Sequence, residues 1–282
     1  MPFRFAFSTN AYTKRSLAEA LVDLARIGYP AVEILADRPH LDPHRCRPKE
    51  VLTLRRLLES CGLALSNLNA NTAHALHSRP PLEALHFEPS FSSPEPDSRR
   101  ARIAYTLQAL DIAADLNCPA VSVTTGRRIE DEPMPLQMER LKRSLDPLLV
   151  RAEALGVRLG LEYEPGLVLE RGLEQVELLR QIPNPFLGAN LDLGHAWVLE
   201  DDLSLVLPGL KGRIWNCHLE DIRDRVHNHL IPGEGNLDFG AVRKGLEAIG
   251  YDGFLTAELY PYTDRPRYAA EKTMAFLRER FA

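Results

Sequence analysis

The feature that most constrains the fold of this chain is a regular alternation of short apolar strand candidates with helix candidates along nearly its whole length. The strands are predicted at residues 4–8, 31–35, 64–69, 120–124, 158–164, 187–192, 214–219 and 253–258. Such alternation implies parallel strands joined by right-handed crossovers. Eight units in 282 residues predict a single (β/α)8 TIM barrel, a fold of ~250 residues, with a doubly wound open sheet as the alternative.

The helix candidates carry recognisable start and stop signals. They lie at residues 16–27, 48–61, 99–116, 137–155, 173–181, 203–207, 239–249 and 267–281. In the first helix, Ser16 and Glu19 are spaced as a capping box, in which each side chain accepts a hydrogen bond from the other residue's backbone N–H, and Gly28 provides the stop. Pro147 lies inside the fourth helix and predicts a kink near Asp146.

Residues 70–98 interrupt this alternation. They contain five prolines and three histidines, which excludes a long regular element. Long loops inside compact domains are often lids or binding loops, and a plain surface insertion is an equally good interpretation. We therefore predict one TIM-barrel domain over residues 1–282, with a long loop insertion at about 70–98 whose role stays open.

Composition narrows the expected partners and compartment. The net charge of −5 and the pI near 6.0 disfavour nucleic-acid binding, which usually needs a basic surface. Four scattered cysteines without paired spacing are typical of a reducing compartment. The chain shows neither the pattern of a signal peptide nor a run of ~20 apolar residues. We expect a cytoplasmic protein that binds neither nucleic acid nor membranes.

Acidic and histidine side chains gather at the ends of four consecutive strands. In a TIM barrel the site lies at the carboxyl ends of the strands, and alternate residues of each strand point inward. On the fifth strand the leucines share the outward face, so Glu162 and Glu164 should point inward. The same alternation turns Asp192, His218 and Glu258 inward on the next three strands.

Three carboxylates in one buried cavity repel each other unless protons or a cation neutralise them. A divalent metal does so directly, and carboxylate oxygens with one imidazole suit Mn²⁺, Zn²⁺, Co²⁺ or Mg²⁺. The alternative is a set of salt-bridged core residues, but these strands carry no inward arginine or lysine. We therefore predict one divalent metal ion bound by Glu162, Asp192, His218 and Glu258.

Five motifs follow the last four strands in a fixed order. They are Leu-Glu162-Tyr-Glu-Pro-Gly, Asp192-Leu-Gly-His195, His218-Leu-Glu-Asp221, His227-Asn-His229 before Gly233-Glu-Gly235, and Glu258. In this order and spacing they resemble the xylose isomerase-like TIM barrel superfamily, which includes sugar phosphate isomerases and epimerases, inosose dehydratase and the AP endonuclease family 2. The resemblance covers nearly the whole chain. It implies the same four metal ligands, and it implies that His195 and His229 face the substrate or a second metal ion.

The other candidate site residues are less specific. Further candidates for substrate contact are His227, Glu164, Asn69 and Trp197. We expect Glu33, on the second strand, to be a polar strand residue paired with a neighbour rather than a support of the metal site. Arg127 and Arg128 follow the fourth strand, and a solvated charged pair is the favoured interpretation over an anion site.

The chain departs from the nuclease branch of that superfamily, which uses extra histidines from strands three and four to hold several zinc ions. Here these strands end in Asn67-Leu-Asn69 and Ser122-Val-Thr124-Thr-Gly126. His227 also stands where that branch has an aspartate. A mononuclear site therefore fits this chain better than a zinc cluster.

The favoured function is a metal-dependent isomerase or epimerase of a sugar or sugar phosphate. Glu162 and Glu258 would move a proton on the carbon beside a carbonyl, through an enediolate, and His195 would orient a hydroxyl. The 70–98 loop, with Trp197 and Tyr12, would cover the site. The alternatives are an inosose-dehydratase-like lyase, a phosphodiesterase acting on damaged DNA, and a non-catalytic metal- or sugar-binding protein. The expected partner is a small carbohydrate or polyol-derived molecule, and a homo-oligomer stays open.

Overall fold

A closed parallel barrel forms the centre of the molecule in the computed structural model, which describes residues 3–79 and 86–281. Its strands are β1 (Arg4–Ser8), β2 (Ala31–Leu35), β3 (Ala64–Asn69), β4 (Ala120–Thr124), β5 (Arg158–Glu162), β6 (Leu187–Asp192), β7 (Ile214–Leu219) and β10 (Phe254–Ala257). They follow one another around the barrel in chain order, and β10 closes it by pairing with both β7 and β1. The predicted (β/α)8 barrel is confirmed.

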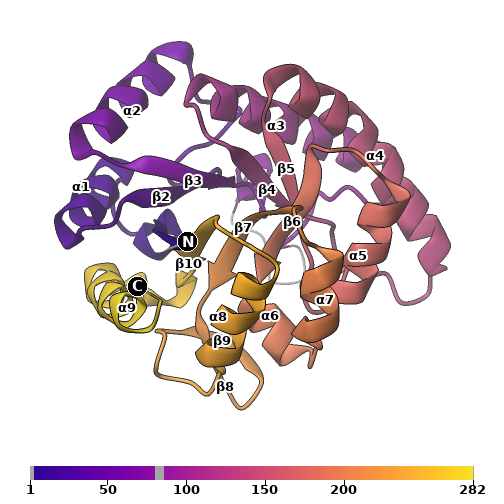
Figure 1. Cartoon of the computed structure of the whole chain (residues 1–282). Coiled ribbons are helices and arrows are strands. Elements are labelled where there is room, and N and C mark those ends of the chain that lie inside the picture. The colour runs from indigo at the N-terminus through magenta and orange to yellow at the C-terminus, as the bar shows by residue number, and fades with distance from the viewer. Residues whose placement is uncertain (1–2, 80–85, 282) are drawn as a thin grey trace.

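Helices surround this barrel on its outside (Figure 1). They are α1 (Leu17–Ile27), α2 (Pro48–Cys61), α3 (Pro96–Asp115), α4 (Met134–Leu155), α5 (Gly172–Gln181), α7 (Leu203–Gly209), α8 (Phe239–Ala248) and α9 (Pro266–Arg280). The capping box of Ser16 and Glu19 is confirmed, and α1 ends at Gly28 with φ +97°. Helix α4 continues through Pro147. No helix among the described residues is long and apolar enough to cross a membrane.

Several short elements were not predicted from the sequence. They are the helix α6 (Leu193–Val198), the antiparallel hairpin of β8 (Asp221–Arg223) and β9 (Val226–Leu230), and the 3-10 turns η1 (Thr9–Tyr12), η2 (His74–Leu76) and η4 (Tyr260–Tyr262). All of them follow barrel strands, so they lie at the end of the barrel where a site is expected. Residues 80–85 of the predicted 70–98 loop, Pro80 and Pro81 among them, lie outside the described residues.

The two faces of the barrel strands have opposite chemistry. Leu159 and Leu161 of β5 are fully buried in the apolar layer between the barrel and its helices. The inward positions instead carry polar side chains that are also buried, such as Asn67, Ser122 and Thr256. Buried polar groups are nearly always hydrogen-bonded, so this polar interior needs a connected network. That network supports the site.

Two register shifts place inward residues beside each other. One shift lies between Val32 and Glu33 in the pairing of β2 with β3, and the other between Ala189 and Asn190 in the pairing of β6 with β7. After the second shift, Asp192 is opposite His218 in the ladder. Bulges of this kind re-aim side chains and are common next to active sites.

Candidate active site

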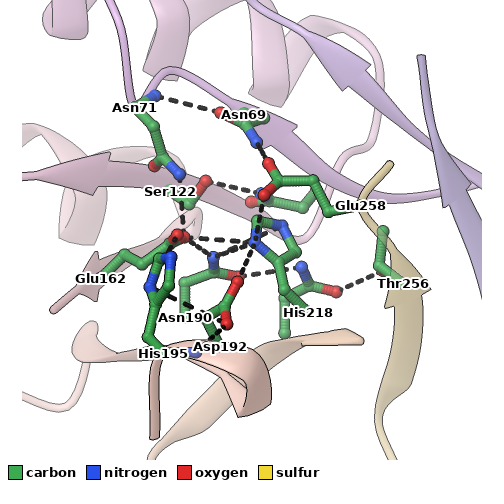
Figure 2. A network of polar contacts seen from close by, with 12 residues as sticks. Asn69, Asn71, Ser122, Glu162, Asn190, Asp192, His195, His218, Thr256 and Glu258 are labelled. Carbon is green, nitrogen blue, oxygen red and sulfur yellow. Dashed lines mark hydrogen bonds and ion pairs between the residues drawn. The ribbon is translucent and has the colours of Figure 1, made fainter. Parts of the chain in front are cut away.

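The four residues predicted as metal ligands meet at the carboxyl ends of β5, β6, β7 and β10. Each of Glu162, Asp192, His218 and Glu258 is buried and offers one ligand atom within 4.8 Å of the others. His218 Nδ1 lies 3.3 Å from Glu162 Oε2, 3.7 Å from Glu258 Oε2 and 3.8 Å from Asp192 Oδ2. Figure 2 shows the three carboxylates turned toward the His218 ring. The arrangement is a preformed set of three carboxylates and one imidazole.

Asparagine amides hold two of these carboxylates in place. Asn10 Nδ2 and Asn69 Nδ2 each donate to Glu258 Oε1 at 2.9 Å, and Asn71 Nδ2 donates to Glu162 Oε2 at 2.8 Å. Asn69 was predicted as a substrate contact, whereas its amide is engaged by the metal-site carboxylate. Asn10 and Asn71 were missed, because they follow the ends of β1 and β3 and carry no charge or motif that singles them out.

Asp192 gives the clearest indication that the site fits a cation. Its Oδ1 accepts from the backbone N–H of His195 at 2.7 Å and so caps helix α6. Its Oδ2 is buried and accepts no hydrogen bond from an N–H group or a hydroxyl among the described residues, and the Asp192 carboxylate also interacts with the carboxyl group of Glu220. An orphaned, buried carboxylate oxygen beside two further carboxylates and an imidazole suits a divalent ion such as Mn²⁺, Zn²⁺, Co²⁺ or Mg²⁺.

A fourth acid, Glu220, lies behind Asp192 and was not identified as a site residue from the sequence. It is fully buried, no N–H group or hydroxyl among the described residues donates to its oxygens, and its carboxyl group interacts with that of Asp192. Burial and the neighbouring Asp192 charge raise the pKa of Glu220 well above its ordinary value. A Cβ atom at residue 194 would lie 1.7 Å from Glu220 Oε1, so Gly194 is required here. The glycine of the Asp-Leu-Gly-His motif therefore makes room for a carboxyl group.

The charges in this site are unbalanced without a cation. Burial, opposed by the charge of His218 and aided by the nearby carboxylates of Glu162 and Glu33, raises the pKa of Glu258 to about 8. Burial lowers the pKa of His218, but the charges of Glu33 and Glu258 outweigh burial and hold it well above its ordinary value. Burial also opposes ionisation of Asp192, yet its histidine neighbours lower its pKa below the ordinary value. A bound divalent ion would neutralise the carboxylates, so that all three could be ionised and the imidazole neutral.

We expect the metal-free protein to lose stability as the pH rises from 6.5 to about 8. The pKa of Glu258 rises from 4.5 to about 8 on folding, so the folded state favours the protonated acid, and this contribution is lost as the pH rises through that range. The raised pKa of His218 acts in the same direction above its ordinary value of 6.5. Each such group contributes ~1.4 kcal/mol per pH unit, so the free energy of unfolding should fall by ~1–3 kcal/mol per pH unit.

Urea unfolding in the presence of a chelator measures this slope. The hairpin histidines do not offset it, because burial lowers the pKa of His227 to about 4 and of His229 to about 3, and both are neutral above pH 6.5 in either state. Saturating Mn²⁺ should abolish or reverse the slope, since metal binding requires the deprotonated carboxylates. A chelated protein whose stability does not change between pH 6.5 and 8 would contradict this picture.

Three histidines form a second cluster beside the four ligands. His195 Nε2 lies 3.0 Å from His227 Nε2, which lies 2.8 Å from His229 Nε2. His195 Nδ1 contacts the carbonyl oxygen of Tyr163, and His229 Nδ1 that of Glu258, both at 2.9 Å. These carbonyls accept the Nδ1 protons, so the Nε2 atoms are left to face a ligand. The cluster can meet substrate hydroxyls or a cation, as the sequence left open.

The carboxylate of Asp221 fixes the loop that follows the histidine hairpin. Its Oδ2 accepts from the backbone N–H groups of Gly233 and Gly235 at 2.8 Å each, and its Oδ1 accepts from Leu237 N at 3.1 Å. A Cβ at residue 235 would lie 2.4 Å from Asp221 Oδ1, which explains that glycine. The motif that ends at Asp221 and the Gly233-Glu-Gly235 motif are therefore joined by hydrogen bonds, which fix both ends of the hairpin that carries His227 and His229.

A cavity of about 570 Å³ opens onto the site. Its lining includes all but one of the predicted substrate contacts, namely His195, His227, His229, Glu164 and Asn69. Burial and the charges of Glu162 and Glu258 raise the pKa of Glu164 well above its ordinary value. Arg127 also lines the cavity, whereas Arg128 pairs with Glu170 at 3.5 Å.

Two aromatic residues that we expected to cover the site lie elsewhere. Trp197 is half-buried on α6 and is not among the described residues that line the cavity, and Arg225 lies 4.8 Å above its ring. Tyr12 is buried in the core, where its ring packs edge-on against Phe7. The cavity wall is formed instead by Phe87 and Tyr260, which were not identified from the sequence.

Comparisons with known proteins agree with this geometry. A family model described as a xylose isomerase-like TIM barrel matches residues 21–280. Fructoselysine 3-epimerase of Escherichia coli O157:H7 is 22% identical over 271 residues, which cover 94% of each protein. Inosose dehydratase of Yersinia enterocolitica serotype O:8 is 24% identical over 184 residues, 57% of this chain and 61% of that protein. The crystal structure of IOLI protein with a binding zinc atom shares the fold, with a TM-score of 0.82 and 16% identity over 98% of this chain and 97% of that one.

Proposed function

The chain belongs to the xylose isomerase-like TIM barrel family, and from that premise we propose that it is a divalent-metal-dependent sugar isomerase or epimerase. The observation that carries the proposal is the pair of buried glutamates, Glu162 and Glu258, that share one ligand cluster. They come from β5 and β10, which β6 and β7 separate in the barrel, so they approach the cavity from different sides. Two carboxylates on either side of one carbon are what a proton transfer between two faces requires.

The residues divide the proposed reaction between them. A divalent ion held by the four ligands would act as a Lewis acid for a carbonyl and an adjacent hydroxyl of the sugar, which would acidify the carbon that bears the hydroxyl. One glutamate removes the proton from that carbon, and the other delivers a proton to the opposite face, which inverts the centre. Asn10, Asn69 and Asn71 hold the two glutamates in position through the hydrogen bonds described above. The three histidines beside the ligand cluster would form hydrogen bonds with substrate hydroxyls.

The relatives support this reaction class and one alternative. Fructoselysine 3-epimerase inverts a sugar carbon and is similar over nearly the whole chain. Inosose dehydratase, similar over a shorter stretch, represents the lyase alternative, in which the same enediolate loses a hydroxyl. Cleavage of damaged DNA is not proposed, because β3 ends in Asn69 and β4 in Thr124, where the nuclease branch needs histidines.

Turnover of candidate ketoses in D₂O tests the proposal. With Mn²⁺ present, an epimerase or isomerase should place deuterium on the carbon beside the carbonyl and return a sugar of unchanged mass apart from the label. Loss of water from the substrate would instead identify the lyase. A protein that loads metal and exchanges no proton on any of a broad set of ketoses and inososes would support a non-catalytic binding protein.

We expect His195→Asn to lower turnover while leaving metal content close to wild type. His195 is held through its backbone N–H by Asp192 Oδ1 and through Nδ1 by the Tyr163 carbonyl, so its Nε2 is available to a substrate hydroxyl. Loss of a positioned hydrogen bond in a buried site costs ~1–3 kcal/mol, or roughly 10- to 100-fold in kcat/KM. Metal analysis and steady-state kinetics separate the two effects. Equal loss of metal and of turnover would assign His195 to metal binding instead.

A further inference from the structure

We propose that Glu33 is a positioning residue of the metal site, which fixes the ring of His218 so that Nδ1 is the nitrogen that binds the ion. The inference rests on the metal site of the proposed function but not on its substrate or reaction. Glu33 Oε2 lies 2.8 Å from His218 Nε2, and both side chains are fully buried. The sequence had favoured Glu33 as a polar strand residue paired with a neighbour rather than as a support of the metal site, and its partner His218 is 185 positions away along the chain.

The neighbours of the His218 ring define which nitrogen carries its proton. A carboxylate oxygen only accepts hydrogen bonds, so the short contact to Glu33 requires an N–H at Nε2. On the other side of the ring, Asn190 Nδ2 donates to Glu162 Oε2 and lies 3.2 Å from Nδ1, so a neutral ring with its proton at Nε2 directs its Nδ1 lone pair toward this amide and the ligand cluster. That lone pair faces the carboxylates of the other three ligands. A histidine that binds metal through one nitrogen and donates from the other to a carboxylate is the usual way to orient such a ligand.

The orientation of the Asn190 amide is itself fixed. Its Oδ1 accepts from Asn216 Nδ2 at 2.8 Å, so its Nδ2 must point toward the metal site. Asn216 Oδ1 in turn accepts from Thr256 Oγ1 at 2.7 Å. This chain of hydrogen bonds crosses the barrel interior and ends at His218, and Figure 2 labels Thr256, Asn190 and His218. The tautomer of the ring is therefore determined from both sides.

Three asparagine amides from two other strands, β3 and β7, hold Glu33 as an acceptor. Asn67 Nδ2 and Asn216 Nδ2 donate to Oε2 at 2.8 Å and 3.2 Å, and Asn69 Nδ2 donates to Oε1 at 3.1 Å. Asn69 also donates to Glu258 Oε1, so one amide joins Glu33 to a second metal ligand. Neither Oε atom is left free to bind the ion. The carboxylate therefore acts on the metal through His218 and Asn69.

Glu33→Gln tests the proposal by direct measurement of metal affinity. The amide nearly keeps the size of the side chain but removes the charge and lets an N–H face Nε2, so the ring is no longer held in one tautomer. After removal of metal with a chelator, we expect the Glu33→Gln protein to bind Zn²⁺ ~10- to 100-fold more weakly than the wild type does. Loss of other residues that orient a metal-binding histidine has an effect of this size. Competition with a chromophoric chelator measures it, and the absorption spectrum of the Co²⁺ form should change as well. Ser122→Ala is the matched control, because Ser122 accepts from Asn67 in the same buried layer without contacting a ligand.

Circular dichroism and thermal melting in the presence of chelator show whether each variant is folded. A second measurement uses the wild-type protein and so does not depend on the folding of a variant. Nuclear magnetic resonance of the wild-type protein with isotope-labelled histidine and bound cadmium should show metal coupling at Nδ1 of His218 and a proton at Nε2. Coupling at Nε2, or a folded Glu33→Gln protein with wild-type affinity, would overturn the proposal. A protein with a Glu33-dependent metal site that converts no sugar would refute the proposed function and leave this inference intact.

Discussion

Replacing either Glu162 or Glu258 by glutamine is expected to reduce kcat by at least ~10²–10⁴-fold, the usual contribution of a general acid or base. Glutamine keeps the size and one oxygen of each side chain, so the hydrogen bonds from Asn71 to residue 162 and from Asn10 to residue 258 can persist. The substitution removes the group that exchanges a proton, and it takes one negative charge from the ligand cluster. Kinetics at saturating Mn²⁺ separate the loss of proton transfer from weaker metal binding.

Two controls make this result specific. Glu170→Gln changes an acid outside the cavity that pairs with Arg128, and it should leave kcat unchanged. The double variant of Glu162 and Glu258 should lose little more than the worse single variant, because both residues serve one reaction path. Deuterium exchange from D₂O should disappear in step with turnover. A Glu258→Gln protein with full metal and near-normal kcat would exclude the two-glutamate mechanism.

Asp192→Ala is expected to abolish stoichiometric metal binding and to lower the stability of the metal-free protein as well. Its two oxygens have separate tasks, since Oδ1 caps α6 at His195 N while Oδ2 is the orphaned atom in the ligand cluster. Loss of a helix cap costs ~0.5–2 kcal/mol. Asp192→Asn is the matched variant, because an asparagine oxygen caps a helix equally well but carries no charge for the metal.

Metal analysis after chelation and reloading, with thermal melting in chelator, distinguishes these two tasks. Both variants should hold far less than one Zn²⁺ or Mn²⁺ per chain, whereas only the alanine variant should melt earlier than the wild type in the absence of metal. Metal content equal to that of the wild type in Asp192→Ala would remove Asp192 from the ligand set. An asparagine variant as unstable as the alanine variant would show that Oδ1 is not the cap.

The sequence predicted the barrel and the four-residue cluster because both depend on local patterns. Alternation along a strand assigns each side chain to a face, and it predicted that Asp192 and His218 lie in one cluster with the two glutamates, as they do in the structure. Helix α6 was missed, because Asp192 was expected to end a strand before a turn, and its second task as a helix cap has no separate signal in the sequence. Short motifs at strand ends therefore predict well which side chains meet, but they predict poorly the secondary structure that follows the strand.

The supporting residues were missed for a different reason. Asn10 reaches Glu258 across 248 positions, and Glu33 reaches His218 across 185. Such partners are defined only by the closure of the barrel and by the register shifts at Glu33 and Asn190. Trp197 illustrates the converse, since an aromatic residue close to the site in sequence packs outside the cavity in space.

The contact between Glu33 and His218 also has a consequence for how the protein matures. On the ribosome the chain emerges from its N-terminus, so Glu33 is synthesised well before His218, and Glu258 follows later still. No nascent fragment that lacks β7 and β10 contains both the oriented imidazole and the complete set of carboxylates. An ion that meets the growing chain therefore finds only scattered acids, which hold divalent ions weakly and with little discrimination. Selection of an ion by the proposed site would therefore come afterwards, in a finished cavity whose geometry no longer depends on the order of synthesis.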